Sequence, residues 1–161
     1  MVRTAGLKEN FAPIKEIFDN VYVISWDYKE NPNGYASWMF HRFDHKPTLY
    51  EIKETILGAY NSEVDDKILN NFSWNGMPVW LSSENQFNYK AAYDLAVQTQ
   101  GESLPVTFKF GSTEEPVYYT FTNLEELSQF YMAAINFINT TLSDGWVKKD
   151  SIDWSVYEIN E

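Results

Sequence analysis

The sequence predicts an α+β fold in which antiparallel β-hairpins pack against two or three amphipathic helices in a single compact domain. Three observations favour this class. Strand patterns occur in pairs around turn signals, capping boxes precede the helical patterns, and no short crossover pattern of a parallel sheet is present. The length of 161 residues suits one domain.

The first hairpin is predicted over residues 21–28 and 35–43. Both segments alternate apolar and polar residues and are rich in β-branched and aromatic types. The intervening Asn-Pro-Asn-Gly sequence at 31–34 is a strong turn signal. The two segments are therefore expected to pair as antiparallel neighbours.

The first helix is predicted to follow this hairpin. Thr48 and Glu51 have the spacing of a capping box, and apolar residues recur at helical spacing from Leu49 to Ile68. We expect a break in this helix near residues 58–62. A soft joint is also expected near residue 70, between an N-terminal unit of hairpin and helix and a C-terminal unit over residues 72–154.

Two further hairpins are predicted in the second half of the chain. The first pairs residues 72–74 with 77–81 around Asn75-Gly76, a dipeptide favoured in two-residue type I′ turns. The second pairs residues 104–110 with 117–121 across a connection rich in turn residues. Each hairpin precedes a helical pattern, so each is expected to pack on a helix.

Capping boxes predict the starts of the two remaining helices. Ser83 with Gln86 begins a helix whose apolar spacing includes Phe87, Ala91 and Leu95, and Gly101 ends it at the left-handed C′ position. Thr122 with Glu125 begins a long amphipathic helix that ends or bends near residues 144–145. The tail carries apolar side chains that are expected to dock back on the domain, namely Trp146, Ile152 and Trp154.

The charge and composition narrow the range of functions. The chain has 23 acidic and 12 basic side chains and a net charge of -11, which argues against a general nucleic-acid-binding protein. It has no cysteine, which excludes disulfides, thiolate metal sites and cysteine nucleophiles. No apolar stretch has the length of a signal-peptide core or a membrane span, so we expect a soluble protein without a membrane partner.

The residue types give little support to an enzyme. His41 and His45 lie four positions apart, which on a strand separates them by about 13 Å and is too far for one zinc ion. No Gly-x-Ser-x-Gly string presents a serine nucleophile. Adjacent carboxylates such as Glu125 and Glu126 are typical of a solvated helix start rather than of a glycosidase. We therefore expect no catalytic residue, no bound metal and no cofactor.

The aromatic content of 17% is the most unusual feature of the sequence. Rings on hairpins usually fill the core between sheet and helix. Some strands carry rings on both faces, so other rings are expected at the surface, where they would bind a protein, a sugar or a base. Together with a small basic cluster, the candidate binding residues are Trp26, Trp38, Arg42, Lys46, Trp74, Trp80, Tyr118, Tyr119 and Trp146.

A resemblance to phage proteins rests on three segments. They are WNGMPVWLSSENQFNYK at 74–90, VTFKF at 106–110 and LEEL at 124–127. The stretch from Trp74 to Trp154 is similar to proteins encoded by gut Bacteroidales phages and prophages. More faintly, it resembles phage families of unknown function found beside tail-fibre genes, although the hairpin at 21–43 departs from that pattern. The resemblance covers about half of the chain and brings no catalytic residues.

The resemblance implies a phage origin and a role in tail-fibre assembly or on the virion. Together with the aromatic excess and the missing catalytic signature, it favours a non-enzymatic protein that binds a phage structural or assembly protein, in the host bacterial cytoplasm during infection or on the virion. A homo-oligomer would be compatible with this role. Two alternatives stay open. A carbohydrate-binding module would present an exposed, coplanar row of rings. A counter-defence protein would sequester a small anionic nucleotide signal where several cations meet beside an aromatic ring, the candidates being Arg42, Lys46, Lys90, Lys109 and Lys148.

Overall fold

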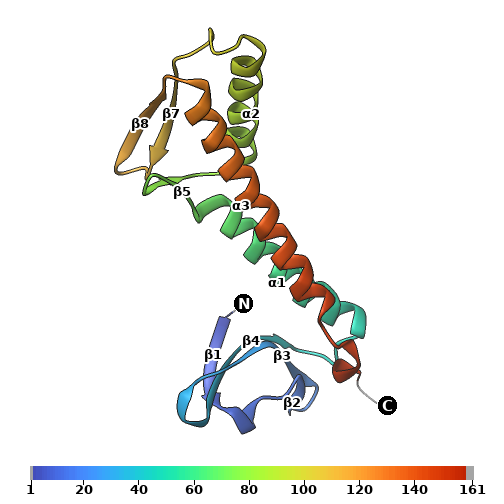
Figure 1. Cartoon of the computed structure of the whole chain (residues 1–161). Helices are drawn as coiled ribbons and strands as arrows, with labels where there is room; N and C mark the ends of the chain where they lie inside the picture. The colour runs from blue at the N-terminus through green and yellow to red at the C-terminus, as the bar shows by residue number, and fades with distance from the viewer. Residues whose placement is uncertain (1, 159–161) are drawn as a thin grey trace. The chain divides into compact units, whose positions relative to one another are not determined.

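The fold is α+β, with three helices and antiparallel sheets in the part of the chain that the structure describes (Figure 1). The structure is a computed structural model, and residues 2–158 are described. The chain divides into two compact units. Of the described residues, unit 1 comprises 2–61 and 148–158, and unit 2 comprises 62–147. The first boundary lies inside a helix, upstream of the joint expected near residue 70.

Unit 1 contains a four-stranded antiparallel sheet in the order β1-β4-β3-β2. The predicted first hairpin is confirmed as β3 (Val21–Glu30) and β4 (Tyr35–Phe43). The edge strands β1 (Val2–Leu7) and β2 (Ile14–Phe18) were not predicted. Their sequences contain glycine, alanine or charged residues at many positions, so their strand conformation depends on pairing with β4 and β3 rather than on a local pattern.

One face of this sheet packs on α1 (Leu49–Asn70). Ile24 and Trp26 of β3 are buried together with Ile52 and Ile56 of the helix. The last described segment closes the same cluster, because Tyr157 is buried there and its hydroxyl donates a hydrogen bond to the Ser25 carbonyl at 2.8 Å. Ile152 and Trp154 also pack on it, which confirms that they dock back, whereas Trp146 is 56% exposed and does not.

Unit 2 contains the two other predicted hairpins. They are β5 (Phe72–Trp74) with β6 (Met77–Val79), and β7 (Val106–Gly111) with β8 (Pro116–Phe121). The Asn75-Gly76 turn has positive φ at both residues, as a type I′ turn requires. The core gathers aromatic rings around Phe130 of α3 (Leu124–Asp150).

The helix starts differ in part from those predicted. The Thr48 capping box is confirmed, because the Glu51 N–H donates to Thr48 Oγ1 at 3.3 Å and the Thr48 N–H donates to Glu51 Oε2 at 2.8 Å. The start of α2 (Ser83–Gln98) was wrong by one residue, since Ser82 accepts from the Asn85 N–H at 3.2 Å. At α3 the cap is Asn123 rather than Thr122. At both of these helix starts, two neighbouring residues have side chains that can act as the N-cap. Tertiary packing selects the one that orients the helix correctly.

The predicted interruptions of the helices were also wrong. α1 is continuous through residues 58–62, and α3 is continuous through 144–145. A glycine inside a helix weakens it but does not end it when packing holds the turns on both sides. At the end of α2, Gln100 and not Gly101 occupies the left-handed C′ position, with φ 52°. The Gly101 N–H then reaches the Ala96 carbonyl at 2.8 Å, in a Schellman motif.

Within residues 2–158, none of the helices combines the length and the apolar character needed to cross a membrane.

Candidate functional site

Three of the tryptophans proposed as binding residues lie in the interior. Trp26 and Trp38 are 4% and 7% exposed, so neither ring has a surface to offer a partner protein. Trp74 is partly buried against Phe121 and Phe130, and its indole N–H has no acceptor among the described residues. Burial therefore removes all three from the candidate contacts with a partner protein, in keeping with the usual role of rings on hairpins.

The other four proposed rings lie at or near the surface of unit 2. Trp80, Tyr118 and Trp146 are 57%, 70% and 56% exposed. They come from different elements, and in the described part of the chain no ring-to-ring contact joins them. Tyr119 is half-buried, and its hydroxyl donates to Glu126 and accepts from the Asn75 amide at 3.3 Å. The carbohydrate alternative, which requires an exposed, coplanar row of rings, stays a prediction.

The cations of the nucleotide alternative are distributed over both units. Arg42, Lys46 and Lys148 belong to unit 1, and Lys90 and Lys109 belong to unit 2. Arg42 is paired with Asp44 at 3.0 Å, and Lys90 is paired with Asp94. Lys148 lies over the Tyr60 ring, 5.8 Å from its centroid.

The two histidines make ordinary local contacts. His45 Nε2 lies 3.0 Å from Glu51 Oε1, and the His41 ring packs edge-on against Phe43. Burial lowers the pKa of His41, which favours its neutral form. Across residues 2–158, no three His, Asp or Glu side chains gather closely enough to hold a metal ion.

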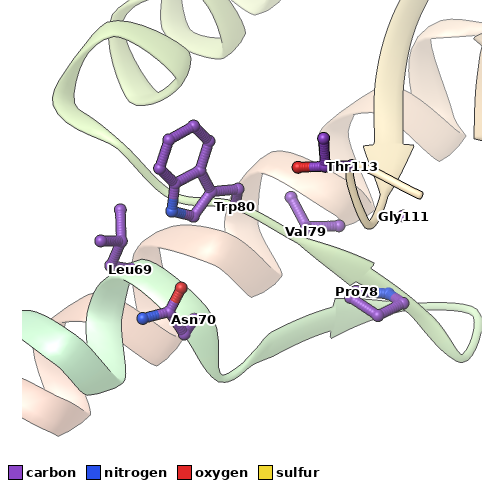
Figure 2. A pocket seen from close by; sticks show the side chains of 7 residues that line it. All are labelled: Leu69, Asn70, Pro78, Val79, Trp80, Gly111 and Thr113. Atoms are coloured by element: carbon purple, nitrogen blue, oxygen red, sulfur yellow. The ribbon is translucent and has the colours of Figure 1, made fainter. Parts of the chain in front are cut away.

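A hollow lies beside Trp80 on the surface of unit 2 (Figure 2). This Trp80 pocket has a volume of about 230 Å³ and is lined by Leu69, Asn70, Pro78, Val79, Trp80, Gly111 and Thr113. The lining comes from the end of α1, from β6 and the residue after it, from the last residue of β7 and from the β7–β8 turn. In Figure 2 Asn70 lies below the Trp80 ring and Thr113 lies to its right.

Local backbone contacts explain why Trp80 faces outward. The Leu81 N–H donates to the Leu69 carbonyl at 3.2 Å, which ties this segment to the end of α1. Val79 and Leu81 are 1% and 2% exposed. Because neighbouring residues of an extended segment point to opposite sides, the buried pair holds Trp80 at the surface.

The two polar residues of the Trp80 pocket are held by their own turns. The Asn70 amide donates to Asp66 Oδ1 at 2.9 Å, which leaves its oxygen to accept a hydrogen bond from a partner. Thr113 lies in the β7–β8 turn, where Gly111 has φ 80° and a Cβ atom would overlap the Glu115 carbonyl. Glycine is thus required for the tight turn that brings Thr113 to the pocket.

The helix α2, which follows Trp80 in the sequence, has an exposed stripe of apolar side chains. Phe87 and Leu95 are 71% and 52% exposed, and Ala91 lies between them at helical spacing. The sequence pattern suggested that this stripe faces the core, but α2 instead buries Tyr89 and Ala96. The Tyr89 ring packs edge-on against Phe130 at 5.1 Å, and this contact determines which side of α2 faces inward.

Most of the negative charge of the chain lies in unit 2. Residues 62–147 contain eleven carboxylates and three lysines, which gives a formal charge of minus eight out of the total of -11. Three of these acidic positions lie close to the Trp80 pocket in sequence: Asp66 binds Asn70, Glu84 is in the first turn of α2, and Glu114 follows Thr113. The pocket lining itself is uncharged.

No family model, curated protein or solved structure with which the chain was compared matches it. Trp80 was predicted as a binding residue from the sequence, but the pocket residues Asn70, Gly111 and Thr113 were not. These residues come from separate segments and carry no motif, so no local signal joins them before the chain is folded. The exposed stripe on α2 was not predicted either. Two faces of α2 have apolar residues at helical spacing, so the sequence does not show which face is buried.

Proposed function

We propose that this chain is a non-enzymatic protein of gut Bacteroidales phages that acts by binding another protein, in tail-fibre assembly or on the virion. The phage origin is inferred from the resemblance carried by residues 74–90, 106–110 and 124–127. The binding activity is inferred from one observation, the exposure of large apolar side chains on unit 2. The Trp80 ring is exposed beside a hollow, and Phe87 and Leu95 are exposed on α2, which begins three residues later.

Trp80 and Phe87 are large apolar side chains that stay exposed in the folded chain. Burying one such apolar side chain is favourable by about 1.5–3 kcal/mol. A partner that covers Trp80 and Phe87 would therefore gain this free energy on binding. Tryptophan is also enriched among the residues that dominate protein interfaces. The Trp80 pocket supplies a concave surface for a partner side chain, and Asn70 supplies an oriented hydrogen-bonding group.

The charge of unit 2 favours a partner with a basic surface. Eleven carboxylates against three lysines in unit 2 favour a protein whose apolar contact patch has a basic rim. Complementary charge would accelerate association at low ionic strength, and added salt would slow it. A phage structural or assembly protein with lysine or arginine around an apolar patch fits this description.

Site-specific photo-crosslinking tests the proposal in cells infected with a phage that encodes the chain. A photoreactive phenylalanine analogue at position 80 is compared with the same analogue at position 50, because Tyr50 is 71% exposed but belongs to unit 1. We expect position 80 to crosslink to one phage protein and position 50 not to do so. Equal crosslinking from both positions would contradict the assignment of the surface.

The purified pair then gives the quantitative test. Trp80→Ala and Phe87→Ala are each expected to weaken binding by at least about tenfold, as hot-spot residues do. Tyr50→Ala is the matched control and is expected to leave the affinity unchanged. Unchanged binding of both unit 2 variants, with their folds intact by circular dichroism, would overturn the proposal.

A further inference from the structure

A second hollow lies in unit 1, on the sheet face opposite α1. It has a volume of about 300 Å³, and its lining includes residues of all four strands. The register aligns Thr4 with Trp38 and Ser25 with Phe40, so these four side chains share one face. Because Ile24 and Trp26 point toward α1, the alternation along β3 directs Ser25 to the other side. We call this hollow the open-face cavity.

Ser25 is the buried polar residue in the lining of the open-face cavity. The residue is 5% exposed and its hydroxyl makes no hydrogen bond to any other described residue. Both backbone groups of Ser25 are engaged, since its N–H donates to the Pro13 carbonyl at 2.8 Å and its carbonyl accepts from the Tyr157 hydroxyl at 2.8 Å. The backbone is therefore fixed, and the hydroxyl, in the lining of the cavity, is left for a group that enters it.

Lys15 supplies the charge at the rim. It lies opposite Val23 in the β2–β3 register, and it is the charged residue in the cavity lining. Within residues 2–158 the Lys15 ammonium has no carboxylate partner. The next cation in the same cross-strand row, Arg42, is already paired with Asp44 at 3.0 Å. The cavity thus offers one uncompensated positive charge.

The geometry points to a binding site for a small monoanion with a flat apolar body, such as an aromatic carboxylate. Trp38 and Phe40 form the apolar wall, Ser25 offers a hydrogen bond inside, and Lys15 attracts a single negative charge at the rim. A volume of about 300 Å³ lies at the lower end of small-molecule sites. One lysine matches one charge, which favours a carboxylate over a polyphosphate. The site is in unit 1 and does not depend on the function proposed for unit 2.

The test uses 1-naphthaleneacetate and its neutral isostere 1-naphthaleneacetamide as probes. The protein is labelled with 5-fluorotryptophan, and the Trp38 fluorine signal is assigned from Trp38→Phe. We expect the carboxylate to shift the Trp38 signal saturably while the Trp80 and Trp146 signals stay in place. The amide should bind about three- to fivefold more weakly, as the loss of one partly exposed ion pair predicts.

Matched variants identify the groups responsible. Lys15→Gln should remove the difference between the two probes, and Ser25→Ala should weaken both. Lys46→Gln makes the same charge change on an exposed residue outside the cavity and should leave both affinities unchanged. An unmoved Trp38 signal, equal binding of acid and amide, or equal effects of Lys15→Gln and Lys46→Gln would each overturn the assignment.

Discussion

Gly145 of α3 packs against Val64 of α1 so closely that a Cβ atom on the glycine would lie within 3.0 Å of Val64 Cγ2. Both residues belong to unit 2. Glycine inside a helix costs about 1 kcal/mol relative to alanine, so local propensity opposes this residue. The close approach of the two helices is the physical reason for its position, and it explains why the glycine does not end α3.

Gly145→Ala is expected to destabilise the fold by about 1–3 kcal/mol, because the added methyl group meets a β-branched side chain with little rotamer freedom. Gly58→Ala is the matched control, since a Cβ atom there meets nothing within 4 Å and should stabilise α1 by about 0.5–1 kcal/mol. Urea denaturation measures both changes. Adding Val64→Ala to Gly145→Ala should recover part of the loss, and strictly additive losses would contradict the packing argument.

Gln100→Gly is expected to stabilise the protein by about 1 kcal/mol. Gln100 has φ 52°, a left-handed conformation that is unfavourable for a residue with a Cβ atom and favourable for glycine. Ala91→Gly is the opposite control, because this exposed residue is inside α2 and its replacement should cost about 1 kcal/mol. Calorimetry measures the change in melting temperature of each variant. A lower melting temperature for Gln100→Gly would show that the C′ assignment is incorrect.

Tyr157→Phe is expected to destabilise the protein by about 1–2 kcal/mol, because it removes the buried hydrogen bond to the Ser25 carbonyl and leaves that acceptor unpaired. Tyr22→Phe removes a comparable bond at the surface, where the hydroxyl donates to Glu16 at 3.2 Å, and should cost about 0.5 kcal/mol or less. Equilibrium urea unfolding compares the two. Equal effects would contradict a special role for the buried bond.

Alkaline pH is expected to destabilise the fold through Tyr89. Burial raises the pKa of Tyr89 to about 12 from the ordinary value of 10.0, so the folded state holds the phenolic proton more tightly than the unfolded chain does. Its stabilising contribution is therefore complete below pH 10 and is lost as the pH rises through 12. Urea midpoints at pH 8 and pH 11 should differ less in Tyr89→Phe than in the wild type, and an unchanged difference would contradict the assignment.

The elements of this fold were largely predictable because their signals are local. The Asn75-Gly76 turn, the Thr48 capping box and the alternation in β3 each act over a few residues, and the structure confirms all three. The strands β1 and β2 were missed because their hydrogen-bonding partners are distant in the sequence. The caps at Ser82 and Asn123 were misplaced by one residue, since neighbouring side chains can cap equally well until packing selects one.

The surface of the molecule depends on contacts that no segment specifies alone. Trp38 and Trp80 both lie in or beside strands, yet one is buried and the other exposed, because exposure depends on what the rest of the chain places against each ring. Phe87 and Tyr89 both fit a helical apolar pattern, and the contact of Tyr89 with Phe130 determines which of them faces inward. Helices and hairpins follow from short-range hydrogen bonding and turn geometry, whereas the two hollows and the exposed aromatic residues arise only when distant segments pack together.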